Sequence, residues 1–236
     1  MKTKRKKILI TSVILILSIG LLCTGILGYL WFGPQFHPAS TAYVYIDQDD
    51  TIDSIYNKVE KAGHPRAFIG FRWMAQYRHY DRNIHTGRYA IRPGESTYHV
   101  MSRLFWGYQE PMNLVVGSVR HLNRLARNVG NQLMTDSTAI ARLLADSTYI
   151  ASLGYDQQTL PALFIPDTYE VYWDMSAEEF LKRMTQEHER FWNKERRSKA
   201  QALGMTPVEV ATLASIVEEE TNNKEEKPIV AGLYIN

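Results

Sequence analysis

The feature that most constrains this chain is an uncharged run near its start, residues 8–32, ILITSVILILSIGLLCTGILGYLWF. A helix needs roughly 20 apolar residues to cross the hydrocarbon core of a bilayer, and this run is longer. It also exceeds the apolar core of about 7–15 residues in a cleaved signal peptide, and no A-x-A-like site follows it. We therefore predict one membrane-spanning helix, with a signal peptide as the alternative.

The residues that flank the run predict its orientation. Residues 1–7, MKTKRKK, hold five basic groups, which the positive-inside rule keeps in the cytoplasm. Tyr29, Trp31 and Phe32 close the run, as aromatic residues do at a membrane interface. We therefore expect a single-pass protein of a cytoplasmic membrane, with the bulk of the chain after Pro34 outside the cytoplasm.

Composition excludes several classes of function. Hydrophobic residues make up 45% of the 236-residue chain, which is enough for one or two domains with cores. Outside the basic tail, acidic residues outnumber basic ones, so we expect no nucleic-acid partner. The single Cys23 excludes an internal disulfide. The seven histidines are scattered, and His188-Glu189 lacks the second histidine of a zinc helix, so we expect no metal and no cofactor.

Periodicity and turn signals predict an α+β fold. A small module combines strands at 41–46, 88–91 and 112–116 with helices near 50–62, 65–80 and 96–105. We expect Tyr89 and Trp106 in its core. The rest of the chain is expected to be mainly helical, with one long helix from a capping box at Ser176 to about Ala202. The predicted parts are a basic tail (1–7), a membrane helix (8–32), a linker (33–40), the module (41–117) and a helical domain (118–236).

The last full helix begins with Thr206-Pro207-Val208-Glu209, a capping box with proline at the first helical position. Beside its core-facing stripe, a second stripe of small residues leads to one carboxylate, Glu218. Partial burial there and two adjacent carboxylates would favour a protonated Glu218, as a general acid needs. The alternative is that Glu218-Glu219-Glu220 is a solvated helix end.

Three stretches resemble a known family. They are LASIVEEETNNKEEKPIVAGLYIN (213–236), PDTYEVYW (166–173) and TGRYAIRPGES (86–96). They resemble the endolytic murein transglycosylases, the MltG or YceG-like family. The resemblance implies that the module at 41–117 is LysM-like. It also implies that residues 118–236 form a partial catalytic domain, truncated at its C-terminal end.

The resemblance also implies roles for individual residues. Glu218 corresponds to the catalytic acid/base of the family. The candidates for substrate binding are Asp167, Thr168, Tyr169, Glu220, Thr221 and Asn236. For the first three, the alternative is a turn followed by a core tyrosine.

The activity that the resemblance implies is endolytic cleavage of the β-1,4 bond between N-acetylmuramic acid (MurNAc) and N-acetylglucosamine (GlcNAc) in peptidoglycan. The products carry 1,6-anhydroMurNAc ends, and nascent glycan elongation would end there. The implied location is the bacterial cytoplasmic membrane. The implied partners are glycan strands, the lipid bilayer and enzymes of cell-wall synthesis. The alternative is a non-enzymatic, membrane-anchored protein that binds peptidoglycan or acts as a scaffold.

Overall fold

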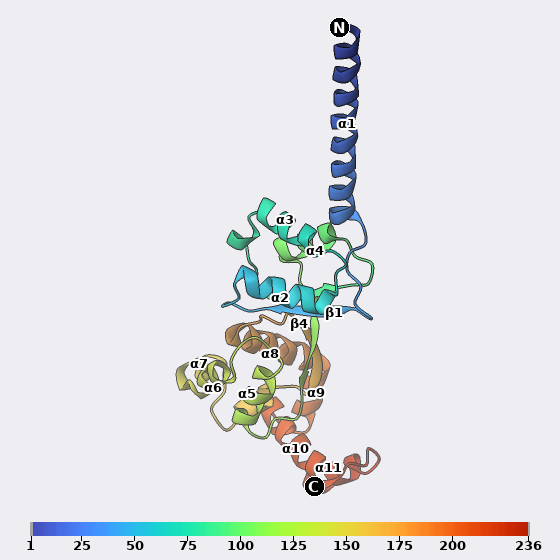
Figure 1. The fold of residues 1–236 in the computed structure, drawn as a ribbon. Coiled ribbons are helices and arrows are strands. Elements are labelled where there is room, and N and C mark those ends of the chain that lie inside the picture. Colours follow the sequence, from blue (N-terminus) through green and yellow to red (C-terminus); the bar gives the residue numbers. More distant parts are fainter. Residues whose placement is uncertain (1, 236) are drawn as a thin grey trace. The chain divides into compact units, whose positions relative to one another are not determined.

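A computed structural model describes residues 2–235, which form two compact units that meet in the sequence at Glu110 and Pro111 (Figure 1). Unit 1 begins with helix α1 (Lys2–Phe32), so the uncharged run is helical as predicted. From Ile10 to Phe32 this helix is long and apolar enough to cross a membrane. Its side chains are exposed from Ile10 to Ile26. An exposed apolar surface of this length is unfavourable in water and favours apolar surroundings.

The rest of unit 1 combines a two-stranded sheet with short helices. The strands run antiparallel, with Ala42 opposite Ile91 and Ile46 opposite Gly87. The elements are β1 (Ala42–Ile46), α2 (Ile52–Gly63), α3 (Ile69–Tyr77), the 3-10 helix η1 (Tyr80–Arg82), β2 (Gly87–Ile91) and α4 (Thr97–Phe105). These agree with the predicted strands and helices, although α3 is shorter at both ends than the predicted helix 65–80.

Segment 33–40 was predicted as a linker, but Gln35, Phe36 and Pro38 within it are buried in unit 1. Phe36 is fully buried and meets Phe71 edge to face, with 6.1 Å between ring centroids. A Cβ atom at Gly63 would overlap the Phe36 ring, so the close approach of α2 requires glycine there. The prediction failed because the proline and polar residues suggested a loop, whereas the Phe36 side chain packs into the core of unit 1.

Two aromatic residues were expected in the core of this module. Tyr89 is buried, and its hydroxyl donates to the carbonyl oxygens of His85 and Thr86. Trp106 is 61% exposed, so this expectation was wrong. Trp106 follows the last residue of α4, and Gly107 turns the chain there with a positive φ of 66°. The indole therefore lies outside, edge to face with Phe105.

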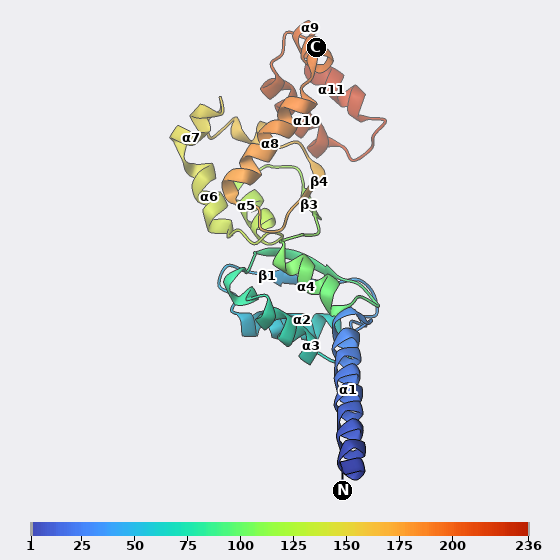
Figure 2. The same cartoon turned by 90° about the horizontal axis from the view of Figure 1, so that it is seen from above.

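Unit 2 is mainly helical around a second two-stranded antiparallel sheet (Figure 2). Its elements are β3 (Met112–Val116), α5 (Leu122–Gly130), α6 (Ser137–Ala145), α7 (Ser147–Ser152), η2 (Leu160–Leu163), β4 (Asp167–Val171), α8 (Ala177–Phe191), α9 (Lys194–Ala202), α10 (Pro207–Glu220) and α11 (Lys227–Ile235). The chain is therefore helix-rich α+β with small sheets, as predicted.

Two expectations for this region need correction. Strand 112–116 was placed in the small module, but it pairs with β4 because Leu114 and Val116 fill the core of unit 2. The long helix predicted from Ser176 to Ala202 is two helices. The capping box at Ser176 is present, but Trp192 turns inward and Asn193 caps a new helix by accepting from the Arg196 N–H at 3.0 Å.

Glu95 joins the segment after α1 to the rest of unit 1. Its backbone carbonyl accepts from the N–H groups of Gln35 and Phe36, at 3.0 and 3.1 Å. Its carboxylate accepts two hydrogen bonds from Arg103, at 2.6 and 2.9 Å, and one from the Arg92 N–H. Burial would raise the pKa of Glu95, but these hydrogen bonds outweigh it and hold the pKa below its ordinary value.

Glu95→Gln should therefore lower the free energy of unfolding of unit 1 by about 1.5–3 kcal/mol at neutral pH. A depressed folded-state pKa gives stability that is complete above the unfolded-state value of 4.5 and is lost as the pH falls through the folded-state value. Urea unfolding of the protein in detergent micelles, from neutral to acidic pH, measures both effects.

Glu110→Gln is the matched control, because Glu110 holds Arg92 in a more exposed pair. This change should lower the free energy of unfolding of unit 1 by less than about 1 kcal/mol. Equal losses for the two variants, or a pH dependence that survives in Glu95→Gln, would contradict the assignment.

Candidate active site

Helix α10 carries Glu218, and its start is built as the sequence predicts. The Thr206 hydroxyl accepts from the Glu209 N–H at 3.2 Å, and the Glu209 carboxylate accepts from the Thr206 N–H at 2.7 Å. Pro207 takes the first helical position. The helix packs on η2 and buries Val217. These contacts set the direction in which the last turn of α10 projects.

Glu218 lies on the exposed side of that last turn. Its side chain is 56% exposed, and Lys227 of α11 donates a hydrogen bond to its carboxylate. Ala214 and Ser215, which were expected to line a groove leading to it, are also exposed. The expected partial burial is therefore absent, because α11 meets Glu218 through a cation and leaves the small residues of α10 uncovered. Glu218 is a carboxylate in an ion pair here.

The two following glutamates have different partners. Glu219 forms an ion pair with Arg120, which lies just before α5. Glu220 accepts a long hydrogen bond, 3.4 Å, from the Tyr234 hydroxyl of α11. Successive helical residues are about 100° apart, so each carboxylate faces another neighbour. Only Glu218 faces Lys227.

A hydrogen-bonded turn brings Lys227 back to Glu218. Thr221 ends α10, and its hydroxyl donates to the Glu226 carboxylate at 2.7 Å and accepts from the Asn223 N–H at 3.0 Å. Asn223 also donates to Glu226 through its side-chain amide. Thr221, a candidate for substrate binding, therefore has a structural role in this turn. Asn236, another candidate, lies outside the described residues.

Glu220, also a candidate, has the Tyr234 contact given above, and the remaining three candidates form the start of β4. Asp167 and Thr168 are exposed, and the Asp167 carboxylate accepts from the Thr168 N–H at 2.7 Å. Tyr169 is buried opposite Leu114, and its hydroxyl donates to the Ile165 carbonyl at 2.5 Å. Burial, helped by the nearby carboxylates of Asp167 and Glu187, raises the pKa of Tyr169 to about 12. Tyr169 thus holds the turn before β4, and the two polar residues remain accessible.

Among the described residues, Glu218 makes no direct polar contact with the three candidates of β4. No hydrogen bond or ion pair within residues 2–235 joins Glu218 to Asp167, Thr168 or Tyr169. Helix α10 contacts η2, and η2 precedes β4 in the chain, so the link between the two groups is indirect. Sequence reasoning also missed Lys227 and Arg120, whose pairing with the glutamates depends on the turn after α10 and on the start of α5. No local signal marks either residue.

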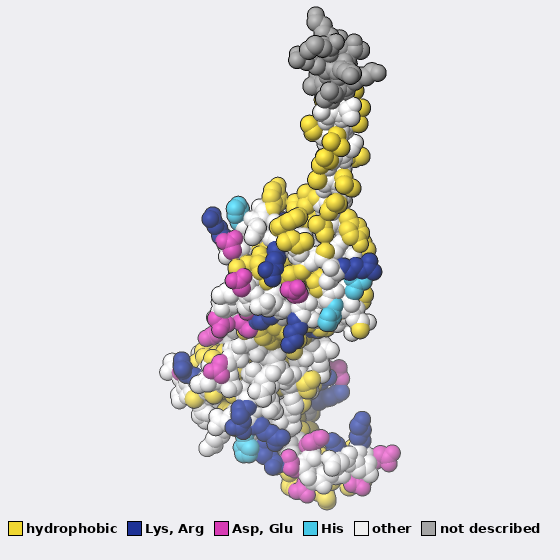
Figure 3. All heavy atoms as spheres, in the orientation of Figure 1, with side chains coloured by type: hydrophobic (Ala, Val, Ile, Leu, Met, Phe, Trp, Pro, Cys, Tyr) yellow, Lys and Arg dark blue, Asp and Glu magenta, His cyan; other side chains and the backbone are white. Residues whose placement is uncertain are grey.

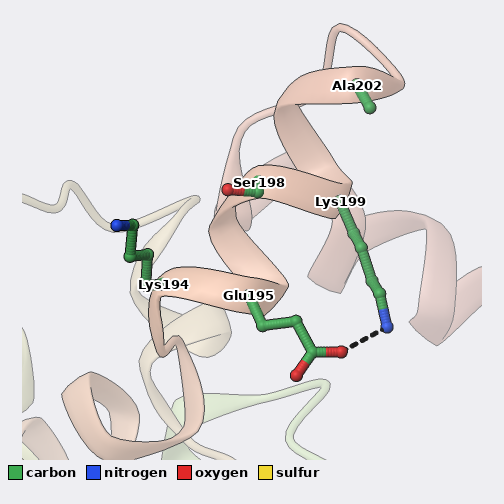
Figure 4. Close-up of a pocket in the computed structure, with 5 residues that line it drawn as sticks. All are labelled: Lys194, Glu195, Ser198, Lys199 and Ala202. Carbon is green, nitrogen blue, oxygen red and sulfur yellow. Dashed lines mark hydrogen bonds and ion pairs between the residues drawn. The ribbon is translucent and has the colours of Figure 1, made fainter.

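One hollow in unit 2 lies on α9, away from these residues in the sequence (Figure 4). Lys194, Glu195, Ser198, Lys199 and Ala202 line it, and Lys199 pairs with Glu195 at 2.6 Å. All five belong to one helix face, so the hollow is open and shallow. Among the described residues, no three His, Cys, Asp or Glu side chains gather as a metal site. The end of α10 offers three carboxylates that face different partners, and two of these partners are cations.

Comparison with known proteins gives the family of the chain. The model of the YceG-like family matches residues 44–236, so the chain belongs to the YceG-like family. A 2.6 Å crystal structure of a protein described as YceG-like, from Listeria monocytogenes, is 19% identical in sequence. The similarity covers 80% of this chain and 67% of that chain, with a TM-score of 0.49. No curated protein matches.

Tyr169→Phe tests the role of this tyrosine. Loss of the hydrogen bond to Ile165 should lower the free energy of unfolding of unit 2 by about 1 kcal/mol. Tyr172→Phe is the matched control, because Tyr172 is 53% exposed in the same stretch, and it should change stability by less than about 0.5 kcal/mol. Urea unfolding measures both. Unchanged stability together with weaker glycan binding by Tyr169→Phe would instead make Tyr169 a substrate contact.

Proposed function

We propose that this protein is a membrane-anchored endolytic lytic transglycosylase of peptidoglycan, with Glu218 as its catalytic acid/base. The observation that carries the proposal is the position of Glu218 within the motif LASIVEEET of a chain that belongs to the YceG-like family. That family is known broadly for murein transglycosylases. The bond cleaved is MurNAc-β-1,4-GlcNAc within a glycan strand.

One carboxyl group suffices for this reaction. Protonated Glu218 donates its proton to the glycosidic oxygen as the bond from that oxygen to muramyl C1 breaks. The resulting carboxylate accepts the proton of the muramyl C6 hydroxyl as O6 bonds to C1. The products are a GlcNAc hydroxyl and a 1,6-anhydroMurNAc end. Water is not consumed, and Glu218 recovers its proton.

The arrangement of the carboxylates supports this route over ordinary glycoside hydrolysis. Hydrolases of the usual kind place two carboxyl groups across the scissile bond. Glu219 and Glu220, the nearest in sequence, face Arg120 and Tyr234. Glu218 is ion-paired with Lys227, so it must exchange this partner for a proton before it acts as an acid. A glycan strand that separates the pair would leave Glu218 to take up this proton from solvent.

The proposed location follows from α1. An apolar helix preceded by five basic residues anchors the protein in the bacterial cytoplasmic membrane with its N-terminus inside. The site then acts outside the cytoplasm, on glycan close to the membrane where strands are being extended. Enzymes that synthesise the cell wall are the partners this location would bring near.

The test is mass spectrometry of the products that the full-length native protein releases from purified peptidoglycan. Glu218→Gln removes the acid and should lower the rate of formation of anhydroMurNAc ends by about 10²–10⁴-fold. Glu219→Gln is the matched control, since it changes the adjacent carboxylate that pairs with Arg120. It should keep most of the activity.

Two outcomes would contradict the proposal. Anhydro ends formed at an unchanged rate by Glu218→Gln would remove Glu218 from the chemistry. Absence of turnover by the unaltered protein, with glycan binding retained, would leave the non-enzymatic peptidoglycan-binding or scaffold protein as the better explanation.

A further inference from the structure

Helix α3 presents an unusual face to solvent. Ile69, Trp73 and Tyr77 follow one another at intervals of four residues and are 47%, 48% and 75% exposed. The opposite face, with Phe71 and Met74, is buried in the core of unit 1. A helix that packs one apolar face on a core normally turns polar residues outward. Here both faces carry large apolar or aromatic side chains.

This face lies beside the end of the membrane helix. A Cβ atom at Gly70 would lie 2.9 Å from the Leu30 carbonyl oxygen, so α3 and α1 are in close contact. The Trp31 and Tyr77 rings are 6.0 Å apart, and the Phe32 and Tyr98 rings are 5.4 Å apart. In Figures 1 and 2, α3 lies on the side of unit 1 from which α1 leaves.

The length of α1 sets the depth at which α3 would lie. The apolar stretch Ile10–Phe32 has 23 residues, about 34 Å at 1.5 Å per residue. The hydrocarbon core of a bilayer is about 30 Å thick. The last turn of α1 therefore reaches the headgroup region, and the residues packed on Leu30, Trp31 and Phe32 reach it too.

The chemistry of this face suits that region. Tryptophan and tyrosine are enriched where a membrane meets water, because their rings are apolar and their N–H and O–H groups are polar. The surrounding segment 64–82 also carries Arg66, Arg72, Arg78 and Arg82 against one acid, Asp81. Arg72 and Arg82 form exposed ion pairs with Glu60 and Asp81, so the net positive charge comes from Arg66 and Arg78. Such a segment is attracted to anionic lipid headgroups. Figure 3 shows the hydrophobic surface of α1 continuing onto the adjoining surface of unit 1.

We propose that Ile69, Trp73 and Tyr77 of α3, with Tyr98 of α4, form a second membrane contact that seats unit 1 on the bilayer crossed by α1. The occupant of this surface is the interfacial layer of a phospholipid membrane. The inference rests on the anchoring role of α1 in the proposed function. Its consequence is that unit 1 is held against the membrane surface and does not swing on a free linker.

The experiment places fluorescent labels at single cysteines of the full chain in phospholipid vesicles that contain anionic lipid. Trp73→Cys in a Cys23→Ser background puts a polarity-sensitive dye on the proposed surface. Gln48→Cys in the same background puts it on the turn after β1, which lies on the other side of unit 1 in Figures 1 and 2. The label at position 73 should show a blue-shifted emission and lose intensity to lipids with a shallow spin label, whereas the label at position 48 should show neither effect.

A charge on the surface separates docking from mere tethering by α1. Ile69→Glu, added to the position 73 label, should restore much of the quenched intensity, because a carboxylate on this face opposes contact with anionic lipid. Asn57→Glu adds the same charge at an exposed site of α2 and should leave the quenching unchanged. Equal quenching with and without Ile69→Glu would mean that α1 alone brings unit 1 near the membrane, and would overturn the proposal.

The native Cys23 tests the anchor itself, since it lies within the apolar part of α1. A dye on Cys23 that is not quenched by lipids with a deep spin label would overturn the anchoring on which the inference rests. Deep quenching at Cys23 with an aqueous label at position 73 would overturn the second contact alone. A label at position 73 that is shielded from water but not quenched by lipid would assign the surface to a protein.

Discussion

The packing of Phe36 in the core of unit 1 joins α1, which is long and apolar enough to cross a membrane, to the rest of unit 1. It lies only four residues beyond the end of α1, and its ring fills the space that Gly63 leaves open. The Gln35 and Phe36 N–H groups are bound to the Glu95 carbonyl, whose own carboxylate is held by Arg103. A short connection that is buried and hydrogen-bonded cannot act as a flexible tether. For this reason the face of α3 beside α1 has a defined position relative to the end of α1.

The end of α10 shows how a helix distributes a run of identical residues. Glu218, Glu219 and Glu220 are adjacent in sequence, yet they meet Lys227, Arg120 and Tyr234. The single-carboxyl mechanism proposed above agrees with this separation, because Glu219 and Glu220 face other partners. In the structure, Glu218 is ion-paired with Lys227 and its side chain is 56% exposed.

Local signals predicted where two of the helices begin. The capping boxes at Ser176 and Thr206 are both present, because each needs only residues within one turn. Predictions that depended on distant partners failed. The helix expected to run to Ala202 breaks at Trp192, whose indole turns into the protein, and Trp106 lies outside where burial was expected. The exposure of each indole depends on which surfaces meet in the folded chain, and a local pattern does not give this.

The sequence by itself determined the apolar helix at the N-terminus, the α+β character and the motif that contains Glu218. Each of these depends on composition, or on the spacing of residues within a few turns. Only the tertiary structure decided that β3 pairs with β4, that Tyr169 supports a turn, and that Lys227 is the partner of Glu218. It also decided that α3 turns aromatic residues outward beside the end of α1. The physical reason is that burial and ion pairing depend on which surfaces meet, and periodicity along one segment gives the faces of that segment but not their partners.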